Sequence, residues 1–148
     1  MVNTKISDLG SRKIALSGKE EIRVPAKGDG TSKSGDAVGI AVTTGYAVRS
    51  DIGASELFIG ILDDQPDMAD DTAITAGKAC SVIIPQSGHK YRVKMEDSGA
   101  SQYKGQPLGF SDTAGAFEDV AALSTAGCVA TLAKDIVDDD TVCEIYWR

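Results

Sequence analysis

The apolar positions between residues 35 and 64 fall into three short runs of β-forming residues, each separated from the next by a turn sequence. The runs are residues 38–42, 46–48 and 57–62, and the turns contain Thr44-Gly45 and residues 50–53. This alternation predicts strand, turn, strand, turn, strand. Residues 57–62 are apolar throughout apart from Gly60, so we expect the central strand here, buried on both faces or buried by another subunit.

The rest of the chain continues this pattern of short strands and polar turns. Further strands are predicted at residues 20–25, 80–85, 90–96, 106–110, 128–134 and 141–147. Residues 90–96 alternate strictly, with Tyr91, Val93 and Met95 on one face, which is typical of an antiparallel strand with one wet face. The turn at residues 85–89 predicts that the strands on either side of it form a hairpin.

Pro25 and Trp147, near the two ends of the predicted β region, each indicate how that end is held. Pro25 indicates either that the pairing of the first strand ends there or that the strand lies at a sheet edge, because proline cannot donate to a ladder. Trp147 stands one residue from the end of the chain, where a terminus normally frays. We therefore expect Trp147 to be tied into the sheet or held by a neighbouring molecule.

The number and spacing of these strands define the fold class. About nine or ten short strands, with almost no 3.6-residue periodicity, predict an all-β fold. A chain of 148 residues fits one domain. We expect a single-domain antiparallel sandwich or partly closed barrel at residues 20–148, preceded by an N-terminal arm at residues 1–19.

Charge is distributed unevenly along the chain. The net charge is −7, but residues 1–34 carry seven Lys/Arg against four Asp/Glu, and the remainder carries eight against eighteen. The acidic total argues against a nucleic-acid partner, since phosphate neutralisation needs a basic face. The basic arm is either a solvated terminus or a segment that binds an acidic surface, on a neighbouring copy or elsewhere.

Neither a signal peptide nor a membrane-spanning run is expected. Residues 1–16 contain charges and lack a long apolar core. No apolar run approaches the roughly 20 residues that a membrane span requires. We expect a soluble protein made in the cytoplasm.

The residues that most often carry chemistry form no recognisable site. Cys80, Cys128 and Cys143 lack CxxC spacing, and we expect buried thiols in a reducing compartment. The Asp-rich residues 63–71 lack the order of an EF-hand loop and indicate a solvated acidic loop. The single histidine, His89, follows Gly88 in a turn and is expected to be exposed. We expect no catalytic residue, metal or cofactor.

A family resemblance adds a functional expectation. The sequence VPAKG is followed by SGDAVGIAV, GYAV, ELFIGILDD, AGKACSVIIP and the closing GCVATLAKDIVDDDTVCEIYW. This order, over residues 22–147, resembles the small capsid cement or head decoration proteins of tailed phages and related viruses. The Asp-rich residues 63–71 and the three cysteines depart from that pattern.

The resemblance implies a protein with a structural role and no enzymatic activity. Proteins of this kind bind the outside of an icosahedral head, as part of the virion, and bridge subunits of the major capsid protein, often as a homotrimer. The basic arm would reach an adjacent subunit, and the apolar central strand would lie near a threefold axis. The residues expected to make protein contacts are Arg12, Lys13, Ile14, Leu16, Phe58 and Trp147.

Two other classes of function are alternatives. One is a ligand- or carbohydrate-binding β module, for which exposed aromatic residues are few. The other is a trimeric all-β nucleotide hydrolase that resembles the dUTP-hydrolysing enzymes. Gly45-Tyr46-Ala47 stands where those enzymes would want an Asp, and their Gly-rich C-terminal arm is missing.

Overall fold

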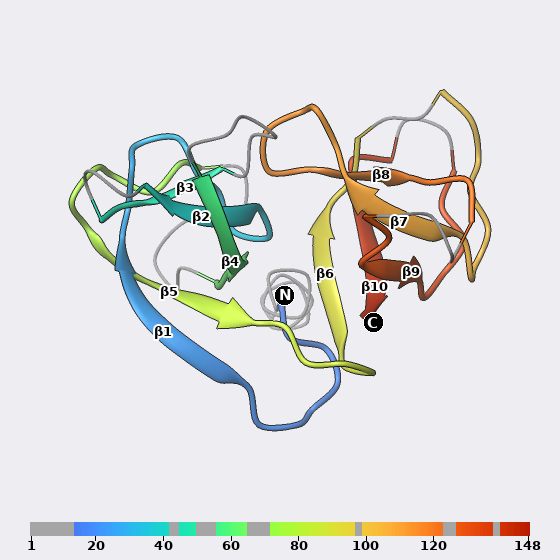
Figure 1. Cartoon of the computed structure of the whole chain (residues 1–148), viewed down its shortest axis with the longest axis horizontal. Coiled ribbons are helices and arrows are strands. Elements are labelled where there is room, and N and C mark those ends of the chain that lie inside the picture. Colours follow the sequence, from blue (N-terminus) through green and yellow to red (C-terminus); the bar gives the residue numbers. More distant parts are fainter. Residues whose placement is uncertain are drawn as a thin grey trace, which may run out of the picture.

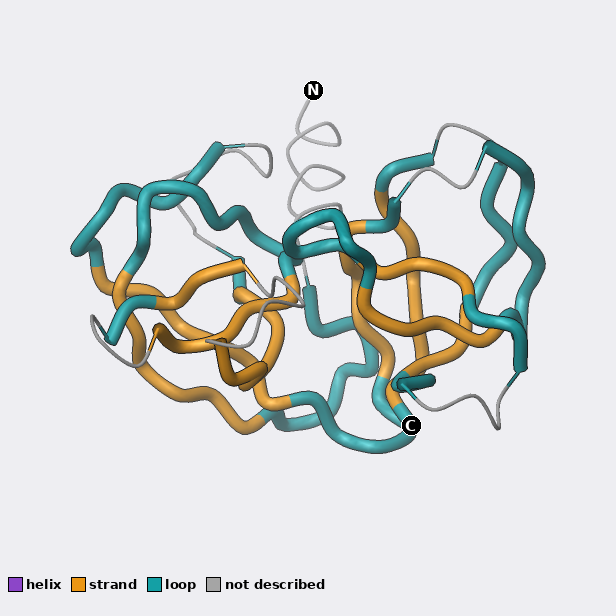
Figure 2. The backbone as a smooth tube through the Cα atoms, turned by 45° about the horizontal axis from the view of Figure 1, so that its top comes forward, coloured by secondary structure: helices purple, strands orange, loops and turns teal. Residues whose placement is uncertain are grey.

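The computed structural model describes residues 14–41, 45–49, 56–64, 72–96, 99–122, 127–137 and 140–148. These residues form strands and loops and contain no helix (Figure 2). The strands are β1 Ile22–Lys27, β2 Ala37–Ala41, β3 Ala47–Arg49, β4 Glu56–Leu62, β5 Ala79–Ile84, β6 Lys90–Lys94, β7 Pro107–Phe110, β8 Phe117–Asp119, β9 Ala130–Leu132 and β10 Val142–Trp147. Nothing in the described part of the chain has the length and apolar character of a bilayer-crossing helix.

The ten strands form two five-stranded antiparallel sheets that pack together without closing into a barrel. The first sheet has the order β1-β5-β4-β2-β3, and the second has the order β6-β10-β9-β7-β8. Figure 1 shows the first sheet on the left and the second on the right, with the described chain entering between them. The sandwich expected from the sequence is confirmed, and the partly closed barrel is not formed.

The turn after β5 carries the chain from one sheet to the other. The predicted hairpin between β5 and β6 is therefore wrong, because β5 pairs with β1 and β4 while β6 pairs with β10. The local turn does form, since the His89 N–H donates to the Gln86 carbonyl. With both of its edges already paired, however, β5 has no free edge to offer β6.

The central position of β4 explains its continuous apolar sequence. Ile61 lies in the main core between the sheets, and Leu62 lies in a second apolar cluster on the opposite face of the first sheet. Both side chains are fully buried. The prediction of a central strand buried on both faces is confirmed. A register shift opposite Val38 and Gly39 leaves Ile59 unpaired and turns Phe58 toward the main core.

Loops close the outer face of the first sheet over the second cluster. Ile74, in the loop before β5, is fully buried there, and its carbonyl accepts from the Gly30 N–H. At Gly28 a Cβ atom would lie 2.5 Å from the Thr75 carbonyl oxygen, so only glycine allows this approach. Of the two alternatives that Pro25 raised, the edge strand is the one formed: β1 lies at the edge of the first sheet, and its pairing continues past Pro25 to Lys27.

The alternation predicted for residues 90–96 is present in β6, and β10 alternates in the same way. Tyr91, Val93 and Met95 are buried, and Cys143 and Ile145 are buried opposite them. Trp147 is tied into the sheet, because it pairs with Ala130 and its N–H donates to the His89 carbonyl.

Candidate interaction surface at the arm

The first described residues, Ile14 to Leu16, attach the N-terminal arm to the edge of the second sheet; we call them the arm root. Ala15 forms an antiparallel bridge with Tyr91 of β6. The Arg92 N–H donates to the Ile14 carbonyl, and the Leu16 N–H donates to the Lys90 carbonyl, both at 2.8 Å. The arm root therefore covers the open edge of β6.

The arm root also contacts the first sheet. The Ile14 N–H donates to Oδ2 of Asp64, which follows β4, at 3.0 Å. Gly35 joins the sheets at the same place, since its N–H donates to the Leu62 carbonyl and its carbonyl accepts from the Lys94 N–H. Gly35 has a φ of +86°, a conformation that other residues rarely adopt. The arm thus starts at a junction held by both sheets.

A pocket of about 200 Å³ opens beside the arm root; we call it the basic pocket. Its apolar lining includes Ile14, Val93 and Val142, and Val142 is 43% exposed. Three cations, Lys33, Arg92 and Lys94, also line it.

Carboxylates of the same chain lie close to the basic pocket. Arg92 stands opposite Glu144 in the pairing of β6 with β10, and Asp135, Asp140 and Glu144 line a second pocket that shares Arg92, Thr141 and Val142 with the first. None of the three cations of the basic pocket forms an ion pair with a carboxylate in the described residues, where Arg23 pairs with Asp63, His89 with Glu21 and Lys90 with Glu144. The one acid that lines the pocket, Asp36, is only 1% exposed and accepts from the Lys33 N–H. The pocket therefore combines an apolar lining with three cations that form no ion pair among the described residues, on a face that also carries carboxylates.

A buried polar cluster fastens the chain between the arm root and β1 to the second sheet; we call it the carboxylate cluster. Glu21 Oε2 accepts from the Tyr91 hydroxyl at 2.7 Å, and Oε1 lies 2.8 Å from His89 Nδ1. The Ser17 hydroxyl also donates to Oε1, at 3.2 Å. Because a carboxylate only accepts, Nδ1 of His89 carries the hydrogen. Burial, together with the Glu21 carboxylate, raises the pKa of Tyr91 above its ordinary value.

The carboxylate cluster corrects the expectation that His89 is an exposed turn residue. Its side chain is only 15% exposed, and that of Glu21 is 1% exposed. The error has a physical reason: the turn places the backbone at the surface, while the side chain follows the alternation of β6. His89 lies two residues before Tyr91 and therefore on the same, inward face. The two-residue alternation of β6 could have indicated that the His89 side chain is buried, whereas no pattern in the sequence indicated that Glu21 would be its partner.

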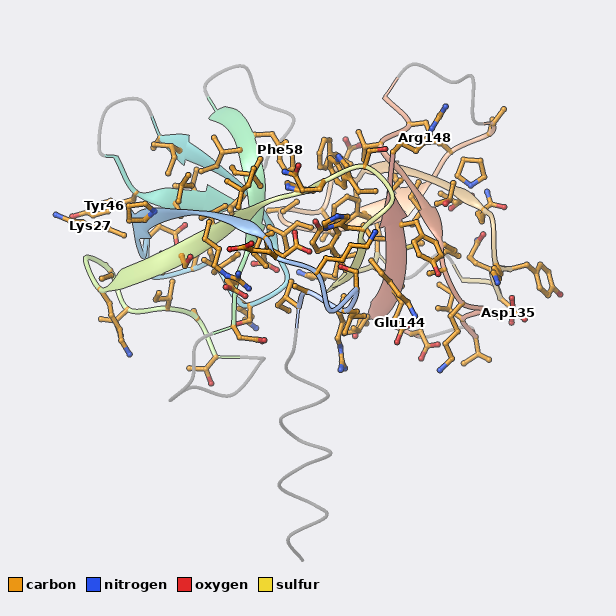
Figure 3. All side chains as sticks on the ribbon, turned by 90° about the horizontal axis from the view of Figure 1, so that it is seen from below. Lys27, Tyr46, Phe58, Asp135, Glu144 and Arg148 are labelled. Carbon is orange, nitrogen blue, oxygen red and sulfur yellow. The ribbon has the colours of Figure 1, made fainter. Side chains whose placement is uncertain are left out.

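An aromatic cluster joins the two sheets in the main core. Phe58 of the first sheet contacts Phe110 and stacks on Trp147, with ring centroids 4.5 and 5.7 Å apart. Phe117 contacts both Phe110 and Trp147. Figure 3 shows Phe58 on the side of the first sheet that faces the second. Phe58 and Trp147 thus make their contacts within the molecule, where they hold the sheets together.

The structure places the other predicted contact residues at the arm root. Ile14 is 4% exposed and belongs to the main core, and Leu16 is half-buried. Arg12 and Lys13 lie outside the described residues. The sequence indicated Ile14 and Leu16 as contacts with a partner protein, whereas the structure places Ile14 in the core of this chain. The basic pocket beside them came only from the structure.

The remaining candidate residues have ordinary structural surroundings. Cys143 is buried as expected, and burial is the main cause that raises its pKa to about 12, while Cys80 and Cys128 are half-buried. Asp63 and Asp64 contact Arg23 and Ile14, and residues 65–71 lie outside the described part. In that part no three His, Cys, Asp or Glu side chains cluster in a way that would hold a metal.

No protein-family model matches this sequence, and no curated protein matches it either.

Proposed function

We propose that this chain is a capsid decoration protein, which binds the outer face of an icosahedral head and bridges neighbouring capsid subunits. The observation that carries the proposal is the anchoring of the arm. Ile14 is bonded to Asp64 of the first sheet and to Arg92 of the second, directly after the basic pair Arg12 and Lys13. A force on the arm is therefore passed to both sheets.

The distribution of chemical groups supports an adhesive role. Glu21 and His89 bond to each other in the carboxylate cluster, where Glu21 also accepts from Tyr91. A cement protein acts through many weak contacts over a large area, so it needs no concentrated site. The acidic remainder of the chain would keep a densely covered head soluble. We expect the bound form to be a homotrimer whose partner is the major capsid protein.

Sedimentation with undecorated capsids tests this proposal. Arg12→Glu with Lys13→Glu reverses the charge of both cations next to the arm root. The matched control is Lys27→Glu with Lys78→Glu, which makes the same change in net charge on exposed side chains. We expect the arm variant to bind capsids at least about tenfold more weakly, because two charge pairs are lost and repulsion replaces them.

A truncated chain that begins at Ile14 provides the second measurement. It keeps every described hydrogen bond and should fold normally by circular dichroism, while capsid binding is lost. If the arm variant and the truncated chain both bind capsids as tightly as the intact protein, the arm does not bind the capsid and the proposal is refuted.

A further inference from the structure

The basic pocket is large enough, and apolar enough, to hold a small molecule. Its volume is about 200 Å³, and most of its lining is apolar. Ile14 of the arm root, Val93 of β6 and Val142 of β10 contribute to that lining. An apolar cavity of about 150 Å³ holds a benzene molecule. The basic pocket therefore has room for an apolar group of that size together with a small polar head.

Two lysines line the basic pocket without lining the second one. They are Lys33, in the loop before β2, and Lys94, the last residue of β6. Both residues are half-buried, and neither forms an ion pair within the described part of the chain. Charged groups that lose part of their water without gaining a partner destabilise the free protein. A bound anion would replace this water with charge-assisted hydrogen bonds.

The charges around the pocket indicate how many negative charges a ligand should carry. Glu144 stands opposite Arg92, lines the second pocket and bonds to Lys90 at 2.6 Å, so it does not reach into the basic pocket. Asp36 does line the basic pocket, where it is 1% exposed. With this one carboxylate set against the two lysines, one positive charge remains. The site therefore fits a ligand with a single negative charge better than a doubly charged phosphate.

Hydrogen bonds of the backbone hold the two lysines in place around the pocket. The Lys33 N–H donates to Oδ2 of Asp36 at 2.8 Å, and the Lys94 N–H donates to the Gly35 carbonyl at 3.2 Å. A ligand therefore meets a wall that is already formed, and little more than the ends of the lysine side chains must become ordered.

We propose that the basic pocket binds a small organic acid. An apolar group of about the size of benzene lies against Val93 and Val142, and a single carboxylate lies between Lys33 and Lys94. The apolar lining selects for the hydrocarbon part, and the lysines select for the acid over its neutral analogues. This binding needs no capsid, so it stands or falls independently of the proposed decoration function.

An NMR titration of the purified full-length protein with sodium benzoate tests this site. Benzamide keeps the shape of benzoate without its charge, while acetate keeps the charge without the ring and inorganic phosphate offers more charge without an apolar part. We expect benzoate to shift the amide signals of Lys94 and Val142 in a saturable way, with a Kd in the millimolar range that suits so small a ligand. The other three compounds should each bind at least about tenfold more weakly.

Two variants locate the binding. Lys33→Gln with Lys94→Gln removes both charges and should weaken benzoate binding at least about tenfold. Lys27→Gln with Lys78→Gln is the matched control at exposed lysines and should bind benzoate as the intact protein does. Val142→Trp should abolish the binding, because the larger side chain fills the cavity. Circular dichroism should give the same spectrum for all of these proteins.

The results that overturn the proposal are equally specific. One is the absence of saturable shifts with benzoate. A second is a benzamide or phosphate affinity that equals that of benzoate, since the ring or the charge alone would then account for binding. The third is full benzoate affinity in the lysine variant or in Val142→Trp, which would place the binding elsewhere on the protein.

Discussion

Removal of the Glu21 carboxylate is the most direct test of how the arm root and β1 are held to the second sheet. Glu21→Ala would leave the His89 ring and the Tyr91 hydroxyl without their acceptor in a site where Glu21 is 1% exposed. Hydrogen bonds to a charged group contribute about 1.5–3 kcal/mol each, and loss of one partner of a buried charged pair costs about 3–5 kcal/mol. We expect the free energy of unfolding to fall by about 3–5 kcal/mol.

Urea unfolding, followed by circular dichroism, measures this loss. Glu20→Gln is the matched control, because Glu20 is the exposed neighbour and should change the stability by no more than about 0.5 kcal/mol. Glu21→Gln keeps the size and one acceptor oxygen, so it should cost less than Glu21→Ala, on the order of 1–3 kcal/mol.

A double-mutant cycle separates the Glu21–Tyr91 hydrogen bond from general packing. Tyr91→Phe removes only the hydroxyl that donates to Glu21 and accepts from the Gln86 N–H. Combined with Glu21→Gln, it should show a coupling of about 1–2 kcal/mol. Additive single and double variants, or a loss below about 1 kcal/mol in Glu21→Ala, would refute the reasoning that this carboxylate holds the segment.

Two further predictions concern the core. Gly60→Ala would place a Cβ atom 2.0 Å from the Ile83 carbonyl oxygen, so β4 and β5 must separate; we expect a loss of at least about 3 kcal/mol in urea unfolding. Gly18→Ala is its control, since no atom lies within 4 Å there and only the φ of +68° opposes the change, at about 1 kcal/mol. The pKa of Cys143 is raised from 9.0 to about 12, so above pH 9 the unfolded state releases this proton first, and the free energy of unfolding should fall by about 1.4 kcal/mol per pH unit. The raised pKa of Tyr91 should lower the free energy of unfolding further above pH 10. In Cys143→Ala the free energy of unfolding should depend less steeply on pH between pH 9 and 10. The same steepness in this variant and in the intact protein would contradict this account.

Whether the sequence could indicate a surface feature depends on how far apart in the sequence its residues lie. The sequence singled out Ile14 and Leu16 beside the basic pair Arg12 and Lys13, but as contacts with a partner protein; their attachment to β6 came only from the structure. The carboxylate cluster could not be anticipated, since Glu21 is separated from His89 by 68 residues and from Tyr91 by 70. The same holds for the basic pocket, which joins Lys33 to Lys94 and Val142.

The aromatic residues show how a correct local inference can leave a role unresolved. The sequence placed Phe58 and Trp147 in strands and indicated that Trp147 is held. Whether a neighbouring molecule or the chain itself provides the contact depends on the approach of β4 to β10. The structure brings their rings to 5.7 Å, which makes them part of the core.

The sequence by itself determined every strand except β8, together with the inward face of β6 and the burial of β4 on both faces. These follow from periodicity and turn residues, which act between near neighbours along the chain. Only the tertiary structure decided that β5 and β6 lie in different sheets and that Glu21 meets His89. Strand pairing depends on competition between distant segments for open edges and buried area, and no local pattern records its outcome.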